Sequence, residues 1–367
     1  MRLIAEPAPD RHEDIEVRMK KVIPALGLAA IAALALSGCG GAAPAAKPAP
    51  AAVEVTDLDS LVEAAKAEGE VRVYAQIPED SMNAFAEAFK EKYGITVDAL
   101  RLGGNTLGSR FDTESDAGTP SGEVLIVVDV EFLATAAEKG AVAGFSDSGV
   151  QPLLDGLPEE AVFDAYDAPL VQVLETGFIY NTDKVDADEV PTSWDELESA
   201  RWKGQYCAVD PGTSVNVAHF FWDMREQFGD EALAAFGAGI GRWYPNIVAL
   251  NEAVAVGECA LGLNSARFFV EMAKDNGAGV EFAAAPSVIP PLVSAGVATA
   301  AEHPHAARLF LHFIMSEEGN RLLNDPAEGS IGPWDTASLP AEFTAPAPGD
   351  FEMVRDATPD VTKALGL

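Results

Sequence analysis

A turn followed by a helix is the first candidate for an anion-binding site in this sequence. Asp210-Pro211-Gly212-Thr213-Ser214 has the residue types of a turn, and the spacing of apolar residues after it predicts a helix that runs to about Phe228. The first N–H groups of such a helix are free and carry the positive end of the helix dipole, so they attract negative charge. Thr213 and Ser214 are therefore candidate ligand-binding residues. The alternative is that one of them is an ordinary N-cap.

Two arginines stand in settings that suit an anionic or polar ligand. Arg267 lies where a strand should pass into a helix, and its guanidinium group can hold a carboxylate or phosphate through two hydrogen bonds. A surface ion pair with Glu271, four residues on, is the alternative. Arg242-Trp243-Tyr244 places a cation beside two amphipathic rings, as polar ligand pockets often do. Here the alternative is a core tryptophan next to a solvated arginine.

The motifs of common enzymes are missing from the sequence. It has no Gly-x-Ser-x-Gly elbow, no Walker loop, no Gly-x-Gly-x-x-Gly after a strand and no His-Glu-x-x-His. His305 and His312 are seven residues apart on one predicted helix, which separates them by about 10 Å, too far to share a metal ion. We therefore expect a binding protein with no catalytic residue, no metal site and no cofactor. An exported hydrolase is the alternative from another class.

The N-terminal segment has the pattern of an export signal. Lys20 and Lys21 precede an apolar run, Val22–Leu36, that is shorter than the roughly 20 residues a membrane-spanning helix needs. The run ends in Leu36-Ser37-Gly38-Cys39, which has the pattern of a lipidation site at Cys39. We therefore expect residues 1–38 to be a leader with a lipoprotein signal peptide and residues 39–55 to be a tether. A plain signal peptide followed by a chance cysteine is the alternative.

Composition narrows the classes of partner. The chain has 367 residues, 24 basic and 58 acidic, and its net charge is −34. Because nucleic acids and anionic lipids both attract basic surfaces, we expect no nucleic-acid partner, and contact with the membrane only through the lipid anchor. A chain of this length usually divides into two domains.

Two cysteines remain after lipidation of Cys39. Cys207 and Cys259 would lie in an exported, oxidising setting, and a disulfide between them would close a loop of roughly 50 residues. Such a bond would add about 4 kcal/mol in the chain-entropy description. The alternative is that both are small buried apolar residues.

Apolar periodicity predicts strands that alternate with helices, and therefore a mostly parallel sheet. The predicted strands are 71–75, 96–102, 123–128, 171–180, 205–209, 259–263, 280–285 and 292–300. The predicted helices are 58–68, 82–93, 131–139, 214–228, 230–236, 252–256, 267–274, 306–315 and 317–323, with a capping box at 193–196. The tail from Pro333 carries few periodic signals.

Several short segments follow one another in a familiar order. They are 71–75, 85–97, 177–185, 191–197, 202–204, 257–258, 303–310 and 316–319. Together they resemble the extracellular solute-binding proteins of ABC importers, especially the ferric-iron-binding-protein-like branch. The resemblance covers roughly Leu58 to Pro333.

The resemblance implies an α/β, two-lobe periplasmic-binding-protein-like fold of type II. Crossover strands would join the lobes, and the ligand would lie in the cleft between them. Residues 56–170 plus 286–340 would form the first lobe, residues 171–285 the second lobe with the hinge strands, and residues 341–367 a C-terminal tail.

The resemblance also suggests where a ligand would bind. The iron branch commonly uses two adjacent tyrosines just after the strand predicted at 259–263, but Asn264–Phe269 contains none. An anion or an anion-bearing chelate is therefore expected in place of bare ferric ion. Cleft loops of this family fall at several positions of this chain, and the full set of expected ligand-binding residues is Gln76, Asn105, Asp129, Glu175, Thr213, Ser214, Arg242, Tyr244, Asn264 and Arg267.

The resemblance implies the lipid-anchored substrate-binding subunit of an ABC importer. As a monomer facing the periplasm or the cell exterior, it would capture a small anionic or metal-chelate solute and deliver it to a membrane permease. One alternative is a ferric iron-binding subunit with carboxylate ligands such as Asp129 and Glu175. Another is a binding module that serves a sensor or an adhesin.

Overall fold

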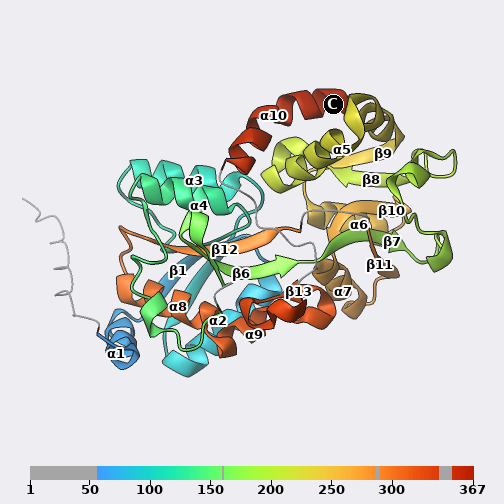
Figure 1. Cartoon of the computed structure of the whole chain (residues 1–367). Helices are drawn as coiled ribbons and strands as arrows, with labels where there is room; N and C mark the ends of the chain where they lie inside the picture. The colour runs from blue at the N-terminus through green and yellow to red at the C-terminus, as the bar shows by residue number, and fades with distance from the viewer. Residues whose placement is uncertain (1–55, 159–160, 286–289, 339–348) are drawn as a thin grey trace, which may run out of the picture. The chain divides into compact units, whose positions relative to one another are not determined.

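A computed structural model describes residues 56–158, 161–285, 290–338 and 349–367. The predicted leader and the predicted tether, with the lipidation site at Cys39, lie outside the described residues. The described residues belong to one compact unit (Figure 1).

The first sheet has the strand order β13-β6-β12-β3-β1-β2, with β4 paired to β12 and β5 paired to β6. Strands β1, β2 and β3 are parallel, whereas β12 runs antiparallel to both β3 and β6. The strand bounds are β1 Glu70–Ala75, β2 Thr96–Arg101, β3 Val124–Val127, β4 Val142–Ala143, β5 Val162–Phe163, β6 Ala168–Leu174, β12 Leu292–Ala298 and β13 Ser330–Ile331.

Helices cover both faces of the first sheet (Figure 1). On one face lie α1 Leu58–Glu68, α2 Glu79–Tyr93, α8 Pro304–Met315 and α9 Glu317–Leu323, and on the other lie α3 Thr106–Asp116 and α4 Val130–Glu138. This burial explains the nearly continuous apolar run of β3, all of whose residues are buried. Phe85, Phe89, Phe310 and Phe313 from α2 and α8 form one aromatic cluster in this core.

The second sheet has the order β11-β7-β10-β8-β9. Helix α5 packs on one face, and α6 and α7 pack on the other. The bounds are β7 Thr176–Asn181, β8 Tyr206–Val209, β9 Ile240–Tyr244, β10 Leu261–Ala266, β11 Val280–Ala284, α5 Val215–Gly239, α6 Ile247–Ala255 and α7 Arg267–Asp275. The backbone at Gly229 is not helical, so α5 consists of two helical segments that meet at this residue, in agreement with the two helices predicted at 214–228 and 230–236.

The strand predicted at 171–180 is divided in the structure. It forms β6 and β7, which are separated at Glu175 and belong to different sheets. The backbone N–H of Glu175 donates to the Gly329 carbonyl on the side of the first sheet. Its carbonyl accepts from the Arg267 N–H on the side of the second sheet. The chain therefore crosses between the sheets at this residue.

Some elements were not predicted from the sequence. Besides α3 and β9, helix α10 (Asp350–Ala364) lies along α5 in a region where periodic signals were weak (Figure 1). Phe351 and Val354 enter one apolar cluster, while Val361 and Leu365 enter another. The capping box predicted at Ser193 is absent among the described contacts, because Glu196 accepts from Thr192 instead. Residues 194–198 form a short 3-10 helix there.

Candidate functional site

A cavity of about 930 Å³ lies where the loops of the two sheets meet. Its walls come from the segments after β1, β2, β3, β8, β9 and β10, the end of a sheet at which α/β proteins usually bind ligands. The crossover strands β6, β7 and β12 add further lining residues. The polar and charged lining residues are Gln76, Arg101, Asn105, Thr106, Ser109, Arg110, Gln172, Thr176, Thr213, Ser214, Asn216, Asn246 and Asn264.

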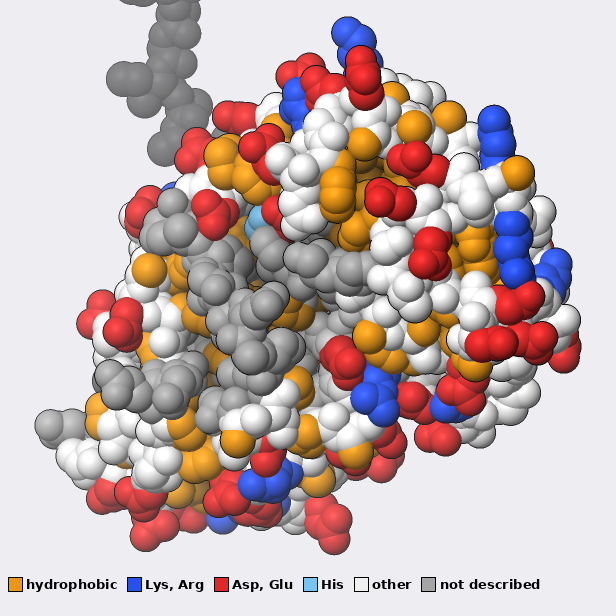
Figure 2. All heavy atoms as spheres, turned by 45° about the vertical axis from the view of Figure 1, so that its right-hand side comes forward, with side chains coloured by type: hydrophobic (Ala, Val, Ile, Leu, Met, Phe, Trp, Pro, Cys, Tyr) orange, Lys and Arg blue, Asp and Glu red, His pale blue; other side chains and the backbone are white. Residues whose placement is uncertain are grey.

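The cavity differs in charge from the outside of the protein. Among the described residues, no Asp, Glu, His, Tyr or Cys lines it, although the chain has 58 acidic residues. Figure 2 shows acidic side chains spread over the visible surface with a few Lys and Arg among them. Neutral amides and hydroxyls, together with Arg101 and Arg110, therefore make up the polar lining.

Several helices begin at the cavity. Residues at the N-terminal ends of α2, α3, α5, α6 and α7 line it. In the described part of the chain, no side chain caps α2, α3, α5 or α7, whereas Asn246 caps α6 by accepting from the Ala249 N–H at 2.9 Å. Each N-terminus carries roughly half a positive charge, so the cavity favours an anion.

Arg101 is the less constrained of the two cavity cations. It ends β2, and none of the ion pairs between described residues involves it. Arg110, by contrast, donates from Nε to Glu114 Oε1 at 2.8 Å and lies over the Tyr74 ring. The Arg101 charge is thus available to a ligand.

Five of the residues expected to bind ligand line the large cavity. They are Gln76, Asn105, Thr213, Ser214 and Asn264. Gln76 Nε2 donates to the Gly104 carbonyl at 2.6 Å, and its Oε1 accepts from the Val128 N–H at 2.7 Å. Gln76 therefore holds the loop after β2 against the end of β3.

The turn before α5 joins this group. The Asn105 N–H donates to the Thr213 carbonyl at 3.4 Å. The Thr213 hydroxyl donates to the Asp210 carbonyl at 2.7 Å. Within the described residues Ser214 makes no side-chain capping bond, so the first N–H groups of α5 are left uncapped. The role of these residues in binding stays a prediction.

Glu175 and Arg267 pair with each other and do not appear in the cavity lining. Arg267 Nη1 lies 3.2 Å from Glu175 Oε2, and its Nε lies 3.5 Å from Glu271 Oε1. Burial opposes the charge of Arg267, but the hydrogen bonds and charges of both carboxylates outweigh burial and raise its pKa. The ion pair with Glu271, considered as the alternative from sequence, therefore forms.

Asp129 borders a smaller adjoining cavity of about 280 Å³. It caps α4 by accepting from the Phe132 N–H at 3.0 Å, and its Oδ2 pairs with Arg355 Nη1 at 3.0 Å. Burial raises the pKa of Asp129 against the opposing effects of these two partners. Asp129 and Glu175 thus have separate cationic partners.

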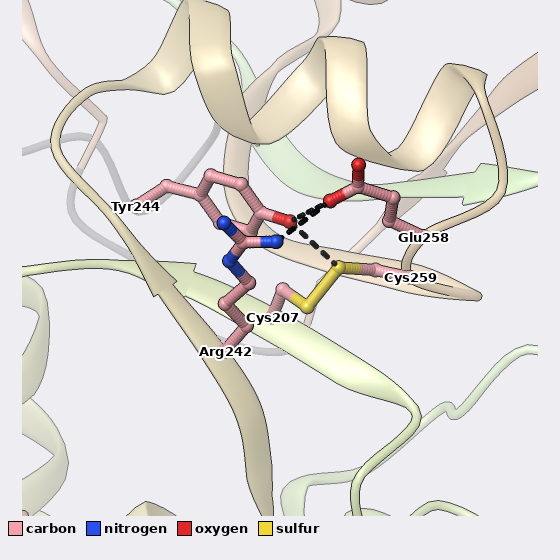
Figure 3. Close-up of a disulfide and its surroundings, with 5 residues drawn as sticks. All are labelled: Cys207, Arg242, Tyr244, Glu258 and Cys259. Carbon is pink, nitrogen blue, oxygen red and sulfur yellow. Dashed lines mark hydrogen bonds and ion pairs between the residues drawn. A yellow bond between two sulfur atoms is a disulfide. The ribbon is translucent and has the colours of Figure 1, made fainter.

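Arg242 and Tyr244 lie outside both cavities, beside a disulfide (Figure 3). The structure joins Cys207 and Cys259, whose Cα atoms are 6.1 Å apart. Glu258 Oε2 accepts from Arg242 Nη1 at 3.0 Å and from the Tyr244 hydroxyl at 2.9 Å. These contacts connect the segment just before β10 to β9. The sequence did not indicate this structural role.

Two searches of the described ranges bear on other kinds of site. No group of three or more His, Cys, Asp or Glu residues there could hold a metal ion. None of the helices in those ranges is long and apolar enough to span a membrane.

Residues 75–321 match a known protein family, described as bacterial extracellular solute-binding protein. The chain belongs to this family. The match confirms the family expected from the sequence, which is one of binding proteins rather than enzymes. A curated relative of this solute-binding protein is an uncharacterized protein of Haemophilus influenzae. It is 24% identical over 274 residues, which span 70% of this chain and 76% of the relative.

Solved structures share the fold of this solute-binding protein. Iron-bound HitA from Pseudomonas aeruginosa matches with a TM-score of 0.61 and 21% identity, over 81% of this chain and 99% of HitA. The periplasmic binding protein AfuA from Actinobacillus pleuropneumoniae, with fructose-6-phosphate bound, matches with a TM-score of 0.61 and 18% identity, over 81% of this chain and 99% of AfuA. A substrate-binding protein of an ABC transporter from Agrobacterium tumefaciens matches with a TM-score of 0.65 and 18% identity, over 82% of this chain and 96% of that protein. These matches confirm the predicted two-lobe periplasmic-binding-protein-like fold.

Sequence reasoning missed several lining residues of this solute-binding protein. Arg101, Asn216, Asn246 and Phe269 were not among the expected ligand-binding residues, yet all four line the cavity. The signal that could have found Arg101 is position, because it ends a strand, whereas Asn246 comes shortly after β9, a strand that was not predicted. Asn216 could have been inferred from its place in the first turn of the predicted helix.

Proposed function

We propose that this solute-binding protein is the lipid-anchored substrate-binding subunit of an ABC importer, and that it captures a small anionic solute. The observation that carries the proposal is that no acidic residue of the described part of the chain lines the large cavity, in a protein of net charge −34. A ligand there meets uncapped helix N-termini, neutral amides and Arg101. These groups stabilise negative charge without a metal ion.

The proposal replaces the carboxylate-ligated iron alternative. A ferric ion is a hard, highly charged cation that would need several anionic oxygen ligands close together, and carboxylates are the oxygen ligands that such cations prefer. The two carboxylates considered for that role are engaged elsewhere, Glu175 with Arg267 and Asp129 with Arg355. A negatively charged metal chelate remains compatible with the cavity, because its outer surface would present anionic oxygens.

We further propose that the lobes are residues 56–170 plus 286–340 and residues 171–285. Glu175 supports a hinge within the strands 171–180 that were assigned to the second lobe, because it separates β6 from β7 and its backbone bonds to both sides. Closure around the ligand would then be a rotation at a few residues that terminate strands. Helix α10, which follows these segments, packs along α5.

Lipidation of Cys39 is the proposed link to the membrane. The motif Leu36-Ser37-Gly38-Cys39 supports it, and the acidic surface gives no electrostatic hold on anionic lipid. The monomeric protein would stay near its permease, facing the periplasm or the cell exterior. Metabolic labelling with a palmitate analogue should mark the wild-type chain and leave Cys39→Ser unlabelled. Labelling that persists in Cys39→Ser would rule out this anchor.

The anionic ligand is tested with Arg101→Ala. Native mass spectrometry of gently purified protein identifies the bound solute, and titration calorimetry then measures its affinity. Loss of a charge-assisted hydrogen bond worth about 1.5–3 kcal/mol predicts a 10- to 100-fold weaker affinity. Arg321→Ala, which removes a surface arginine paired with Glu317, is the matched control and should bind normally. A cationic solute, or equal affinity in both variants, would contradict the proposal.

The earlier expectation for Arg267 has its own test. Arg267→Ala leaves binding unchanged if its partners are only Glu175 and Glu271, and weakens it if the side chain turns to the ligand. Measuring it beside Arg101→Ala shows which arginine serves the cavity.

A further inference from the structure

The lining of the large cavity is divided into two kinds of surface. Arg101, Asn105, Thr106 and the start of α5 supply charge and hydrogen-bonding groups. The crossover strands supply the apolar side chains of Leu174 and Val293 together with the polar residues Gln172 and Thr176. Helices α3 and α7, which begin at the cavity, lie well apart in Figure 1. A ligand that fills the cavity therefore meets both a polar and an apolar surface.

The first turn of α7 adds two aromatic rings to the apolar part. Phe268 and Phe269 both line the cavity, and their ring centroids are 6.1 Å apart. Phe268 is 8% exposed and belongs to the core of the first sheet, whereas Phe269 is only half-buried against that core. The adjacent Arg267 is held by Glu175 and Glu271. The α7 end of the cavity thus presents carbon surfaces rather than charge.

Cavity size separates an organic ligand from an inorganic ion. Pockets of about 300–1,000 Å³ bury drug-sized molecules, and this cavity of about 930 Å³ lies at the upper end of that range. An inorganic oxyanion at Arg101 would leave the half-buried ring of Phe269 facing water, whereas Leu174 and Val293 are already buried. An apolar body attached to the anionic group would cover this ring, and removing that area from water favours binding.

We propose that the ligand is an organic anion in which a carboxylate or phosphate group is joined to an apolar or ring-bearing body. The anionic group lies at Arg101 and the uncapped helix ends, and the body lies against Phe269 and the crossover strands. This inference rests on the proposed function and adds the chemical class of the solute. Bare metal ions and inorganic oxyanions are excluded as its principal ligands.

Two matched pairs of probes test the inference on the full-length protein after its bound solute has been removed by dialysis. Inorganic phosphate is compared with phenyl phosphate, and acetate with phenylacetate, by titration calorimetry. In at least one pair, the member with the ring should bind at least tenfold more tightly. Equal affinity within both pairs, or tighter binding of inorganic phosphate, overturns the inference but leaves the anion-binding function in place. Failure of all four anions to bind, with a cation or neutral molecule released from the purified protein, overturns both.

Variants of Phe269 locate the apolar contact. Phe269→Ala should reduce the preference for the ring-bearing probe to less than threefold and leave the affinity for its small partner unchanged. Phe269→Leu, which keeps an apolar surface, should retain most of the preference. Phe228→Ala removes an aromatic residue that is 44% exposed and lies outside the cavity, so it is the matched control. A preference that survives Phe269→Ala intact, in protein with wild-type circular dichroism, places the ring elsewhere and overturns the assignment.

Discussion

Elements from the two sheets meet in two regions that differ sharply in chemistry. In one lies the large cavity, lined by amides, hydroxyls and arginine. In the other, an apolar cluster brings together residues from β6 and β12, the start of α5, and α10, among them Leu170, Val215 and Phe351. The cavity is left open for a ligand, whereas the apolar cluster is packed. The packed region buries apolar side chains of elements that also border the cavity, while the cavity itself stays open.

The cavity and the packed region also differ in where acidic side chains lie. Acidic side chains are absent from the described lining of the cavity, whereas they gather beside α10. There Arg355 pairs with Asp129 at 3.0 Å and Glu131 at 3.6 Å, and the Glu352 N–H donates to Glu131. The carboxylates beside α10 thus serve structure, and Arg355 balances part of the charge that Asp129 brings to the edge of the adjoining cavity.

The largest expected effect is on the packed region. Phe351 is 2% exposed and its ring lies 5.7 Å from that of His219. Phe351→Ala should lower the free energy of unfolding by about 3–5 kcal/mol, because it leaves a cavity in the cluster. Met353→Ala, on the same helix at 44% exposure, should change it by less than about 0.5 kcal/mol. Chemical denaturation measures both, and similar losses in the two variants would mean that the cluster is not a packed core.

Gly104 offers a corresponding test in the cavity region. It has φ +53°, and a Cβ there would collide with the Thr213 carbonyl oxygen. Gly104→Ala should cost about 1–2 kcal/mol of stability and weaken ligand binding, because it pushes the loop after β2 away from the turn before α5. Gly103→Ala is the matched control, since Gly103 has no atom within 4 Å of an added Cβ. Calorimetry that finds the same affinity in both variants would show that this contact is unnecessary for binding.

A smaller effect is expected from Arg355→Ala. The change removes the cation between Asp129 and Glu131, whose side chains are 21% and 12% exposed. Leaving these carboxylates without a cation should cost about 1–2 kcal/mol, more than the 0–1 kcal/mol of an exposed pair. Arg321→Ala, which breaks exposed pairs, is the comparison. Equal losses in the two variants would make the α10 pairs ordinary surface contacts.

The smallest effect depends on pH. Burial, with the charges of Asp350 and Glu226, raises the pKa of Asp223 from 3.8 to about 7. Nearby His219, whose Nε2 is 3.8 Å from Asp223 Oδ1, has its pKa lowered by burial and so gives little compensating charge near neutral pH. Between pH 4 and 7 the folded state therefore holds a proton that the unfolded state has lost, and stability falls as pH rises through this window.

Asp223→Asn removes this dependence. At pH 8 the variant should melt roughly 2–4 °C above the wild type, and the difference should shrink toward pH 5. Differential scanning calorimetry at both pH values measures it. A variant that is less stable than the wild type at pH 8 would show that Asp223 is charged and usefully paired in the folded protein.

Local patterns predicted much of the fold and part of the site. Alternating apolar segments predicted the principal strands of both sheets, and the helices predicted at 58–68 and 82–93 end where the structure has Gly69 and Gly94 as C-caps. The family resemblance assigned Gln76 and Asn105 to cleft loops, Asn264 was expected where a strand passes into a helix, and the structure puts all three at the cavity. Such features depend on neighbours along the chain. Helix α10 was missed because its apolar residues are few and serve two different clusters.

The sequence by itself determined the alternation of strands and helices, the acidic net charge and the order of segments that marks the family. Only the tertiary structure decided which cations are free. Arg267 and Arg101 look alike in sequence, yet the fold places two carboxylates against Arg267 and leaves Arg101 at the cavity. The physical reason is that a charge is defined by the groups within a few ångströms of it. For Arg267 they are the nearby Glu271 and also Glu175, which lies far away along the chain and which only the fold brings into contact.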